Sequence, residues 1–142
     1  MSTRSIIGYK MDNGKIRNIY CHYDGYLSYN GRILLESYNT LDKVKELVSH
    51  GSLSYLESKV NPIGNNHTFG TPESGVCVYY GRDRGEDWEQ VKYNDNTLEE
   101  LLDGGLSYIE YYYIFDNGHW YVIDHESELK VLTMEMCENE GY

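Results

Sequence analysis

Two strand–turn–strand patterns built around Asn-Gly constrain the fold of this chain more than any other feature of its sequence. Each pattern places strand-forming residues on both sides of the dipeptide, at Asn13-Gly14 and at Asn117-Gly118. Asn-Gly favours a type I′ turn because both residues accept a positive φ, and such turns join antiparallel strands. The sequence therefore predicts two hairpins, with strands over residues 5–11, 15–23, 108–115 and 119–124.

Further strands and two helices are predicted between and after the hairpins. Val76–Tyr80 is a fifth strand and Leu129–Leu132 a sixth. Residues 41–49 follow the N-cap pair Asn39-Thr40 and repeat apolar residues with helical spacing. A shorter helix follows Asn96, with Glu99 in the position of a capping box. These elements predict an α+β fold, a mainly antiparallel sheet of four to six strands with two short helices packed on it.

The length of 142 residues predicts one domain, which we expect to cover residues 1–134. The acidic segment 135–142 is expected to be a frayed tail. Residues 58–75 contain both prolines without apolar periodicity, so they form a loop that is long for a small domain. A second polar loop covers residues 81–90, and Trp88 is its one large apolar side chain.

The distribution of cysteine, histidine and apolar residues indicates a cytoplasmic protein without metal or cofactor. The N-terminus has no apolar run typical of a signal peptide, and no segment approaches the ~18 apolar residues of a membrane-spanning helix. Three widely spaced cysteines predict reduced thiols rather than disulfides or a zinc site. The five histidines lack metal-binding spacing, and glycine-rich phosphate loops are absent from the sequence.

Charge and tyrosine content point to a binding function. Residues 1–70 carry 8 basic and 6 acidic side chains, whereas residues 71–142 carry 4 and 17, which gives the second half a net charge of −13. Such a field repels nucleic-acid phosphates and attracts basic partners, although solubility alone is an equally good explanation. The chain also has 16 tyrosines, a residue type common on recognition surfaces and in strands.

The segment Ile19–Tyr26 combines several chemically active side chains. Alternation along a strand places Tyr20 and His22 on one face and Cys21 and Tyr23 on the other, before a turn at Asp24-Gly25. His22 with Asp24 is a candidate general base, because a carboxylate can fix the imidazole tautomer. In the favoured alternative, Asp24 caps the turn and His22 packs against tyrosines. The candidate binding residues here are Tyr20, His22, Tyr23, Asp24 and Tyr26.

Arg82 and Arg84 are the only basic side chains between Lys59 and Lys92. Guanidinium groups pair equally well with carboxylates and with anionic ligands. Pairing with Asp83, Glu86 or Asp87 is the favoured interpretation, and a phosphate-and-base pocket formed with nearby tyrosines is the alternative. Arg82, Asp83, Arg84 and Trp88 complete the set of candidate binding residues, with no catalytic or metal-binding residue assigned.

Four motifs in the same order resemble a family of small accessory proteins of tailed bacteriophages and prophages. They are S-T-R-S-x-I at 2–7, I-Y-C-H-Y-D-G-Y at 19–26, Y-G-R-D-R-G-E at 80–86 and Y-Y-I-F-x-N-G-x-W at 112–120. Tyr23 stands where the family has Trp. The resemblance implies a protein that interferes with host machinery or antiviral defence by binding in the cytoplasm of the infected bacterium.

Three functional hypotheses follow. In the first, the acidic, tyrosine-rich half binds a basic surface of a host protein, without membrane or direct nucleic-acid binding, and inhibits it. In the second, a homodimer or higher oligomer sequesters a nucleotide immune signal with Arg82, Arg84, Tyr20, His22 and Tyr26. In the third, His22 and Asp24 act as acid and base in a phosphodiesterase.

Overall fold

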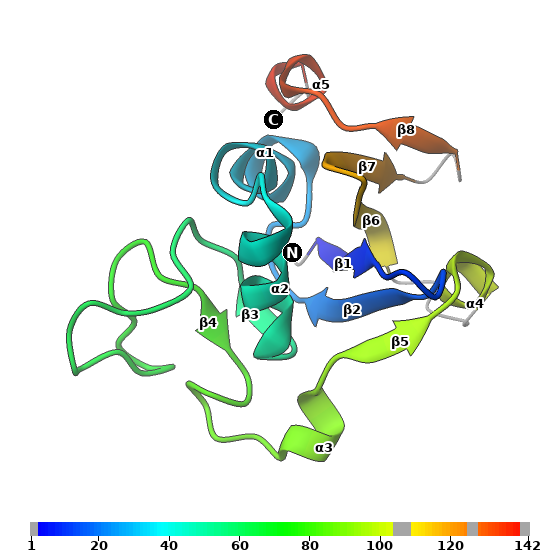
Figure 1. The fold of residues 1–142 in the computed structure, drawn as a ribbon. Helices are drawn as coiled ribbons and strands as arrows, with labels where there is room; N and C mark the ends of the chain where they lie inside the picture. The colour runs from blue at the N-terminus through cyan, green and yellow to red at the C-terminus, as the bar shows by residue number, and fades with distance from the viewer. Residues whose placement is uncertain (1–2, 104–108, 125–127, 140–142) are drawn as a thin grey trace.

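The computed structural model describes residues 3–103, 109–124 and 128–139, and its centre is a mixed β-sheet with short helices on both faces (Figure 1). The strands are β1 Arg4–Lys10, β2 Ile16–Cys21, β3 Leu53–Tyr55, β4 Val78–Tyr79, β5 Asn94–Asn96, β6 Ile109–Asp116, β7 His119–Ile123 and β8 Leu129–Val131. The helices are the π-helix η1 Leu27–Gly31 and the α-helices α1 Arg32–Ser37, α2 Leu41–Ser49, α3 Trp88–Val91, α4 Leu98–Asp103 and α5 Met134–Glu138.

Both predicted hairpins are confirmed. β1 pairs antiparallel with β2, and β6 pairs antiparallel with β7. The second turn has the two positive φ angles that Asn-Gly favours, 51° at Asn117 and 82° at Gly118. In the first turn Gly14 has a φ of 85° but Asn13 does not have a positive φ, so the predicted type I′ turn is wrong here although the hairpin forms. Residue 108, the first of the predicted strand 108–115, lies outside the described residues.

The predicted sheet type is wrong. The sheet has eight strands in the order β4-β3-β2-β1-β6-β7-β8, with β5 also paired to β2. β1 and β6 run parallel at its centre, and β2 pairs parallel with β3. The two hairpins thus meet through their first strands, which makes the sheet mixed rather than mainly antiparallel. Each turn determines its own hairpin, whereas long-range packing determines how the hairpins join.

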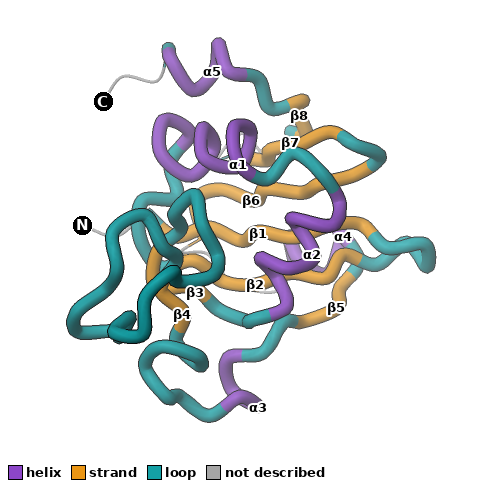
Figure 2. Tube along the Cα trace, turned by 60° about the vertical axis from the view of Figure 1, so that its left-hand side comes forward, coloured by secondary structure: helices purple, strands orange, loops and turns teal. Residues whose placement is uncertain are grey.

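The larger core lies on the face of the sheet that α1, α2, η1 and α5 cover (Figure 2). Ile7, Ile19 and Tyr113 from the central strands belong to this core, together with Val44 and Leu47 of α2. α2 matches the predicted helix, and the Thr40 side chain caps it by accepting a hydrogen bond from the Lys43 N–H.

A smaller core lies on the opposite face, where Leu101 of α4 packs on Ile6, Ile16 and Ile114. The predicted capping box is present but shifted by one residue. The Thr97 hydroxyl accepts a bond from the Glu100 N–H, and the Glu100 carboxylate accepts one from the Thr97 N–H. Asn96 belongs instead to β5, a strand that the sequence analysis missed.

The C-terminal segment forms α5 rather than starting a frayed tail at residue 135. Thr133 caps this helix, and the Cys137 side chain is buried in the larger core. Residues 140–142 lie outside the described residues. No helix of the described residues has the length and apolar character needed to cross a membrane.

Candidate functional site

The predicted site residues Tyr20 and His22 lie on the same face of the sheet. Tyr20 packs against the smaller core, and its hydroxyl forms a 2.6 Å hydrogen bond with Nδ1 of His22. Burial, together with the nearby positive charge of Arg4, lowers the pKa of His22. The described residues include no hydrogen bond between His22 and Asp24, so Tyr20, rather than the carboxylate, orients the imidazole.

Tyr23, Asp24 and Tyr26 have different environments. The Tyr23 side chain is 44% exposed, and its ring and the His22 ring lie edge to face with centroids 4.5 Å apart. The prediction that these two side chains lie on opposite strand faces is wrong, because β2 ends at Cys21 and the alternation ends with it. Asp24 occupies the turn with a φ of 57°, and its carbonyl accepts a bond from the Asn30 N–H. The Tyr26 ring lies 6.3 Å from that of Tyr29. Asp24 therefore lies in the turn as expected, and its contribution there is made by the backbone.

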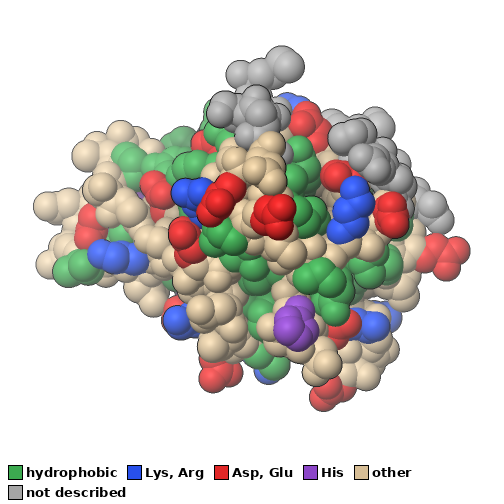
Figure 3. All heavy atoms as spheres, turned by 90° about the horizontal axis from the view of Figure 1, so that it is seen from above, with side chains coloured by type: hydrophobic (Ala, Val, Ile, Leu, Met, Phe, Trp, Pro, Cys, Tyr) green, Lys and Arg blue, Asp and Glu red, His purple; other side chains and the backbone are tan. Residues whose placement is uncertain are grey.

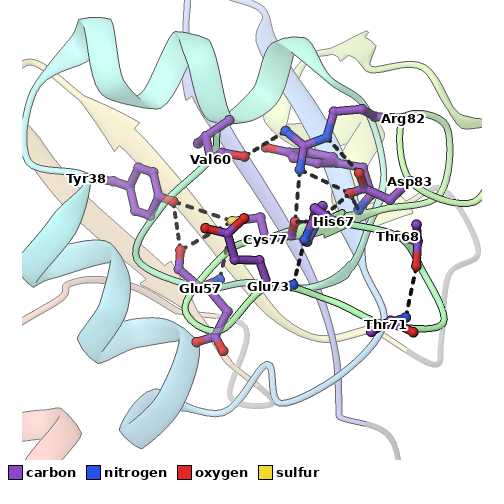
Figure 4. A network of polar contacts seen from close by, with 11 residues as sticks. Tyr38, Glu57, Val60, His67, Thr68, Thr71, Glu73, Cys77, Arg82 and Asp83 are labelled. Carbon is purple, nitrogen blue, oxygen red and sulfur yellow. Dashed lines mark hydrogen bonds and ion pairs between the residues drawn. The ribbon is translucent and has the colours of Figure 1, made fainter. Parts of the chain in front are cut away.

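Arg82 and Asp83 are turned inward and form a buried polar network (Figure 4). The Arg82 guanidinium donates to both carboxylate oxygens of Asp83, to the Val60 carbonyl at 2.6 Å and to the Cys77 carbonyl at 3.0 Å. Burial alone would raise the pKa of Asp83, yet bonds from Arg82 and the Tyr79 N–H hold it below its usual value. The predicted pairing of Arg82 with Asp83 is confirmed. Because of it, neither side chain is in position to line a nucleotide pocket.

His67 joins this network from the middle of the 58–75 loop, with a side chain only 2% exposed (Figure 4). Its Nδ1 accepts a 2.9 Å bond from the Glu73 N–H, so the neutral ring carries its proton on Nε2. Nε2 lies 3.1 Å from the Cys77 carbonyl oxygen and 3.3 Å from Asp83 Oδ2. The sequence analysis missed this residue because its partner Asp83 is distant in the chain.

Arg84 points to the outside and belongs to a cluster of aromatic rings. Its guanidinium carbon lies 4.9 Å from the Phe69 ring and 6.0 Å from the Tyr80 ring, and its Nε is 2.8 Å from Glu86. The Phe69 and Tyr80 rings are 6.1 Å apart, and backbone bonds to Ser52 and Ser54 place Tyr80 and Tyr23 next to the same short segment. We call Tyr23, Phe69, Tyr80 and Arg84 the aromatic patch.

β3 explains why the aromatic patch forms. The Tyr23 N–H donates to the Ser54 carbonyl, and the Tyr80 N–H donates to the Ser52 carbonyl. Two segments that are far apart in the chain therefore lie on either side of β3. The sequence analysis predicted Tyr23 and Arg84 but missed Tyr80 and Phe69. Phe69, an aromatic residue within a polar loop, was the one available signal.

Trp88 begins the short helix α3 and is 43% exposed. Its ring meets that of Tyr93 edge to face, with centroids 6.2 Å apart. A side chain at Gly51 would collide with the Val91 carbonyl and approach the Trp88 ring to 3.0 Å. The indole therefore packs against the chain around Gly51 and keeps part of its surface exposed.

The buried thiols are poorly suited to nucleophilic chemistry. Burial raises the pKa of Cys21 to about 12 and that of Cys77 to about 11. The Cys77 thiol is bonded to the backbone of Glu57 and lies 3.5 Å from the Tyr38 hydroxyl. Within the described residues, no group of three or more His, Cys, Asp or Glu side chains is arranged to hold a metal ion.

Part of the negative charge of the second half is paired with basic side chains of the chain itself. Six of its carboxylates form ion pairs with lysine or arginine: Asp83, Glu86, Glu89, Asp95, Asp116 and Asp124. On the face shown in Figure 3, acidic side chains are interspersed with basic and apolar ones. The net charge of −11 remains, and it acts as a property of the whole chain.

Three depressions in the surface lie away from the predicted site. The largest, about 700 Å³, is lined by both hairpin turns and the start of α2, including Asp12, Thr40 and Asn117. A second, about 300 Å³, adjoins it, and a third of about 270 Å³ lies between Leu98 and Leu129. None of the nine predicted site residues lines any of these three depressions.

Comparisons with protein-family models, with curated proteins and with solved structures find no match for this chain. The resemblance to phage accessory proteins therefore stays a prediction that rests on the four sequence motifs.

Proposed function

We propose that this chain is a phage-encoded, non-enzymatic binding protein that inhibits a host protein of antiviral defence or of nucleic-acid machinery in the cytoplasm of the infected bacterium. The observation that carries this proposal is the aromatic patch, in which Tyr23 and Arg84 are exposed around the rings of Phe69 and Tyr80. Aromatic side chains and arginine are enriched among the residues that contribute most to protein binding, and aromatic rings bury a large area at a low cost in conformational entropy.

The net charge of −11 supports a partner with a basic surface. A negative field raises the rate of encounter with a cationic protein and disfavours direct contact with nucleic-acid phosphates. In this proposal the charge guides association from a distance and the aromatic patch makes the lasting contact. A single acidic contact surface is not required.

A nucleotide immune signal is the second candidate ligand. Arg84 lies over Phe69 and beside Tyr80, and this combination can hold a phosphate and stack a base. A sponge of this kind would act as a homodimer or higher oligomer. Its support is weaker, because Arg82 is committed to Asp83 and to backbone carbonyls. The phosphodiesterase alternative has less support still, since Tyr20 holds His22.

The test is capture from a lysate of phage-infected host cells by the immobilised chain, with mass spectrometry of the retained proteins and small molecules. Wild type is compared with a Tyr23→Ala/Arg84→Ala double variant and with Leu129→Ala, an exposed residue of the edge strand at the other end of the sheet. We expect wild type and Leu129→Ala to retain a basic protein, and the double variant to lose it. Added salt should release this protein from wild type.

Two other outcomes of this capture would count against the proposal. Retention of a nucleotide without any protein would favour the hypothesis that the chain sequesters a nucleotide signal. Equal retention of the same protein by the double variant would show that the aromatic patch is not the contact.

A further inference from the structure

Backbone hydrogen bonds join the two ends of the 58–75 loop. The Lys59 N–H donates to the Gly75 carbonyl, and the Lys59 carbonyl accepts from the Cys77 N–H at 2.8 Å. Lys59 and Val76 form an isolated parallel bridge. The two ends of the loop are therefore fixed side by side, as in compact surface loops that frequently carry function.

Polar contacts fasten the loop at further points. Arg82 bonds to the Val60 carbonyl, His67 lies against Asp83, and the Phe69 N–H donates to the Asp83 carbonyl. Phe69 belongs to a turn that is closed where the Thr71 N–H donates to the Thr68 hydroxyl. Figure 4 shows this bond. A loop with this many internal bonds has already lost much of the conformational entropy that binding would otherwise remove.

The Glu73 carboxylate forms hydrogen bonds with the backbone at Ile63 and Gly64. One of its carboxylate oxygens accepts from the Ile63 N–H and the other from the Gly64 N–H, both at 3.0 Å. These two bonds lower the pKa of Glu73, so the carboxylate is ionised at neutral pH. The backbone at Ile63 and Gly64 is thereby restrained, while the Ile63 side chain remains exposed.

Ile63 is the most exposed large apolar side chain of the described residues, at 80%. Its neighbours Asn61, Asn65 and Asn66 are exposed and uncharged. One exposed apolar residue is ordinary on a protein surface. Here, however, the backbone on both sides of Ile63 is fastened. The Arg82–Asp83 network bonds to the Val60 carbonyl and the Phe69 N–H, and the Glu73 carboxylate bonds to the Ile63 N–H. This arrangement suits the insertion of one aliphatic side chain into a preformed hollow.

We propose that the 58–75 loop is a preformed recognition loop that inserts Ile63 into an apolar pocket of the protein partner, while Phe69 at its other side joins the aromatic patch. The inference rests on the proposed function and specifies its contact. The pocket would match a branched aliphatic side chain and have a polar rim that faces the asparagines and accommodates the carboxylates of Glu46 and Glu73, which bond to Asn61 and to the Ile63 and Gly64 backbone. A protein partner fits better than a lipid surface, because the −11 charge opposes approach to anionic lipids.

The first test needs no partner. Hydrogen exchange is measured at the amides of Ile63 and Gly64 in the full chain. We expect protection in wild type and a loss of that protection in Glu73→Gln, whose neutral amide is a weaker acceptor. Exchange of both wild-type amides at the rate of an unstructured peptide would overturn the inference, because the loop would then not be preformed.

The second test compares Ile63→Ala with Leu41→Ala in binding to the protein that wild type retains from the lysate. Leu41 is a matched control, since it is an exposed aliphatic residue on a different element. We expect Ile63→Ala to weaken binding about 10- to 100-fold and Leu41→Ala to leave it unchanged. Glu73→Gln, which keeps Ile63, should weaken binding by less than Ile63→Ala. A photoreactive residue at position 63 should cross-link to apolar pocket residues of that same protein.

The outcomes separate this inference from the proposed function. If Tyr23→Ala/Arg84→Ala abolishes binding and Ile63→Ala does not, the loop inference fails and the proposed function stands. Cross-linking from position 63 to lipid or to a second copy of this chain would also overturn the inference. If wild type retains no protein, both fail.

Discussion

At the residue scale, the side chains with the most reactive chemistry stabilise the fold. Arg82, Asp83 and His67 satisfy one another and nearby backbone groups, and Cys77 is bonded to the backbone of Glu57. Buried polar groups that are fully satisfied rigidify a structure, whereas an unpaired member is costly. The exposed Tyr23 and Arg84 are the predicted site residues best placed to contact another molecule.

Asp83→Asn should destabilise the protein in a pH-dependent way. The folded-state pKa of Asp83 lies below its unfolded value, so its stabilisation is complete above about pH 4 and is lost as pH falls through the folded pKa. We expect the variant to lose roughly 2 kcal/mol of unfolding free energy at neutral pH and much less at strongly acidic pH. Denaturant unfolding across this pH range measures the difference. A loss that is independent of pH would contradict the assignment.

Cys21 and Cys77 should resist alkylation in the folded protein. Burial raises the pKa of both thiols, so little thiolate exists at mildly alkaline pH, and reagents cannot reach it. Iodoacetamide followed by peptide mass spectrometry should find both unmodified in native buffer and modified in concentrated guanidinium chloride. Rapid labelling of either residue in native buffer would show an accessible nucleophile.

At the element scale, the hairpins were predictable and their arrangement was not. Asn-Gly chemistry acts within a few residues, and it correctly indicated β1–β2 and β6–β7. The parallel contact of β1 with β6 joins distant segments and depends on burial of both sheet faces. β5 was missed because Asn94–Asn96 has none of the residues typical of strands. The capping box was placed one residue early because Asn96 and Thr97 are both good caps.

Gly8 in β1 should tolerate no side chain. A Cβ there would lie 2.6 Å from the Arg17 carbonyl oxygen and 2.9 Å from Asn18 Cβ. We expect Gly8→Ala to cost about 1–3 kcal/mol, because the paired backbone cannot move away without breaking the β1–β2 ladder. Gly70→Ala is the control, since a Cβ at that position would meet no atom within 4 Å and its φ is not positive. Thermal or denaturant unfolding of the two variants measures the difference. An equal loss of stability in both would contradict the predicted collision at Gly8.

At the scale of the whole molecule, the candidate site combines segments that no local pattern connects. The sequence indicated Tyr23 and Arg84 separately. Backbone bonds to Ser54 and Ser52 bring Tyr23 and Tyr80 to the same segment, and the bond from the Phe69 N–H to the Asp83 carbonyl brings Phe69 next to Arg84. Counting charges along the chain also does not reveal that Arg17 pairs with Asp95 or Lys10 with Asp116. What persists at this scale is the net charge, which acts beyond contact distance at low ionic strength.

The most direct measurement of the central claim is the kinetics of binding between the chain and its captured protein partner, at low and high salt, for wild type and Tyr23→Ala. The account predicts that salt lowers the association rate constant, because the charge guides encounter. Tyr23→Ala should mainly raise the dissociation rate constant, because the aromatic patch holds the complex. An association rate insensitive to salt, together with an unchanged dissociation rate for Tyr23→Ala, would contradict it.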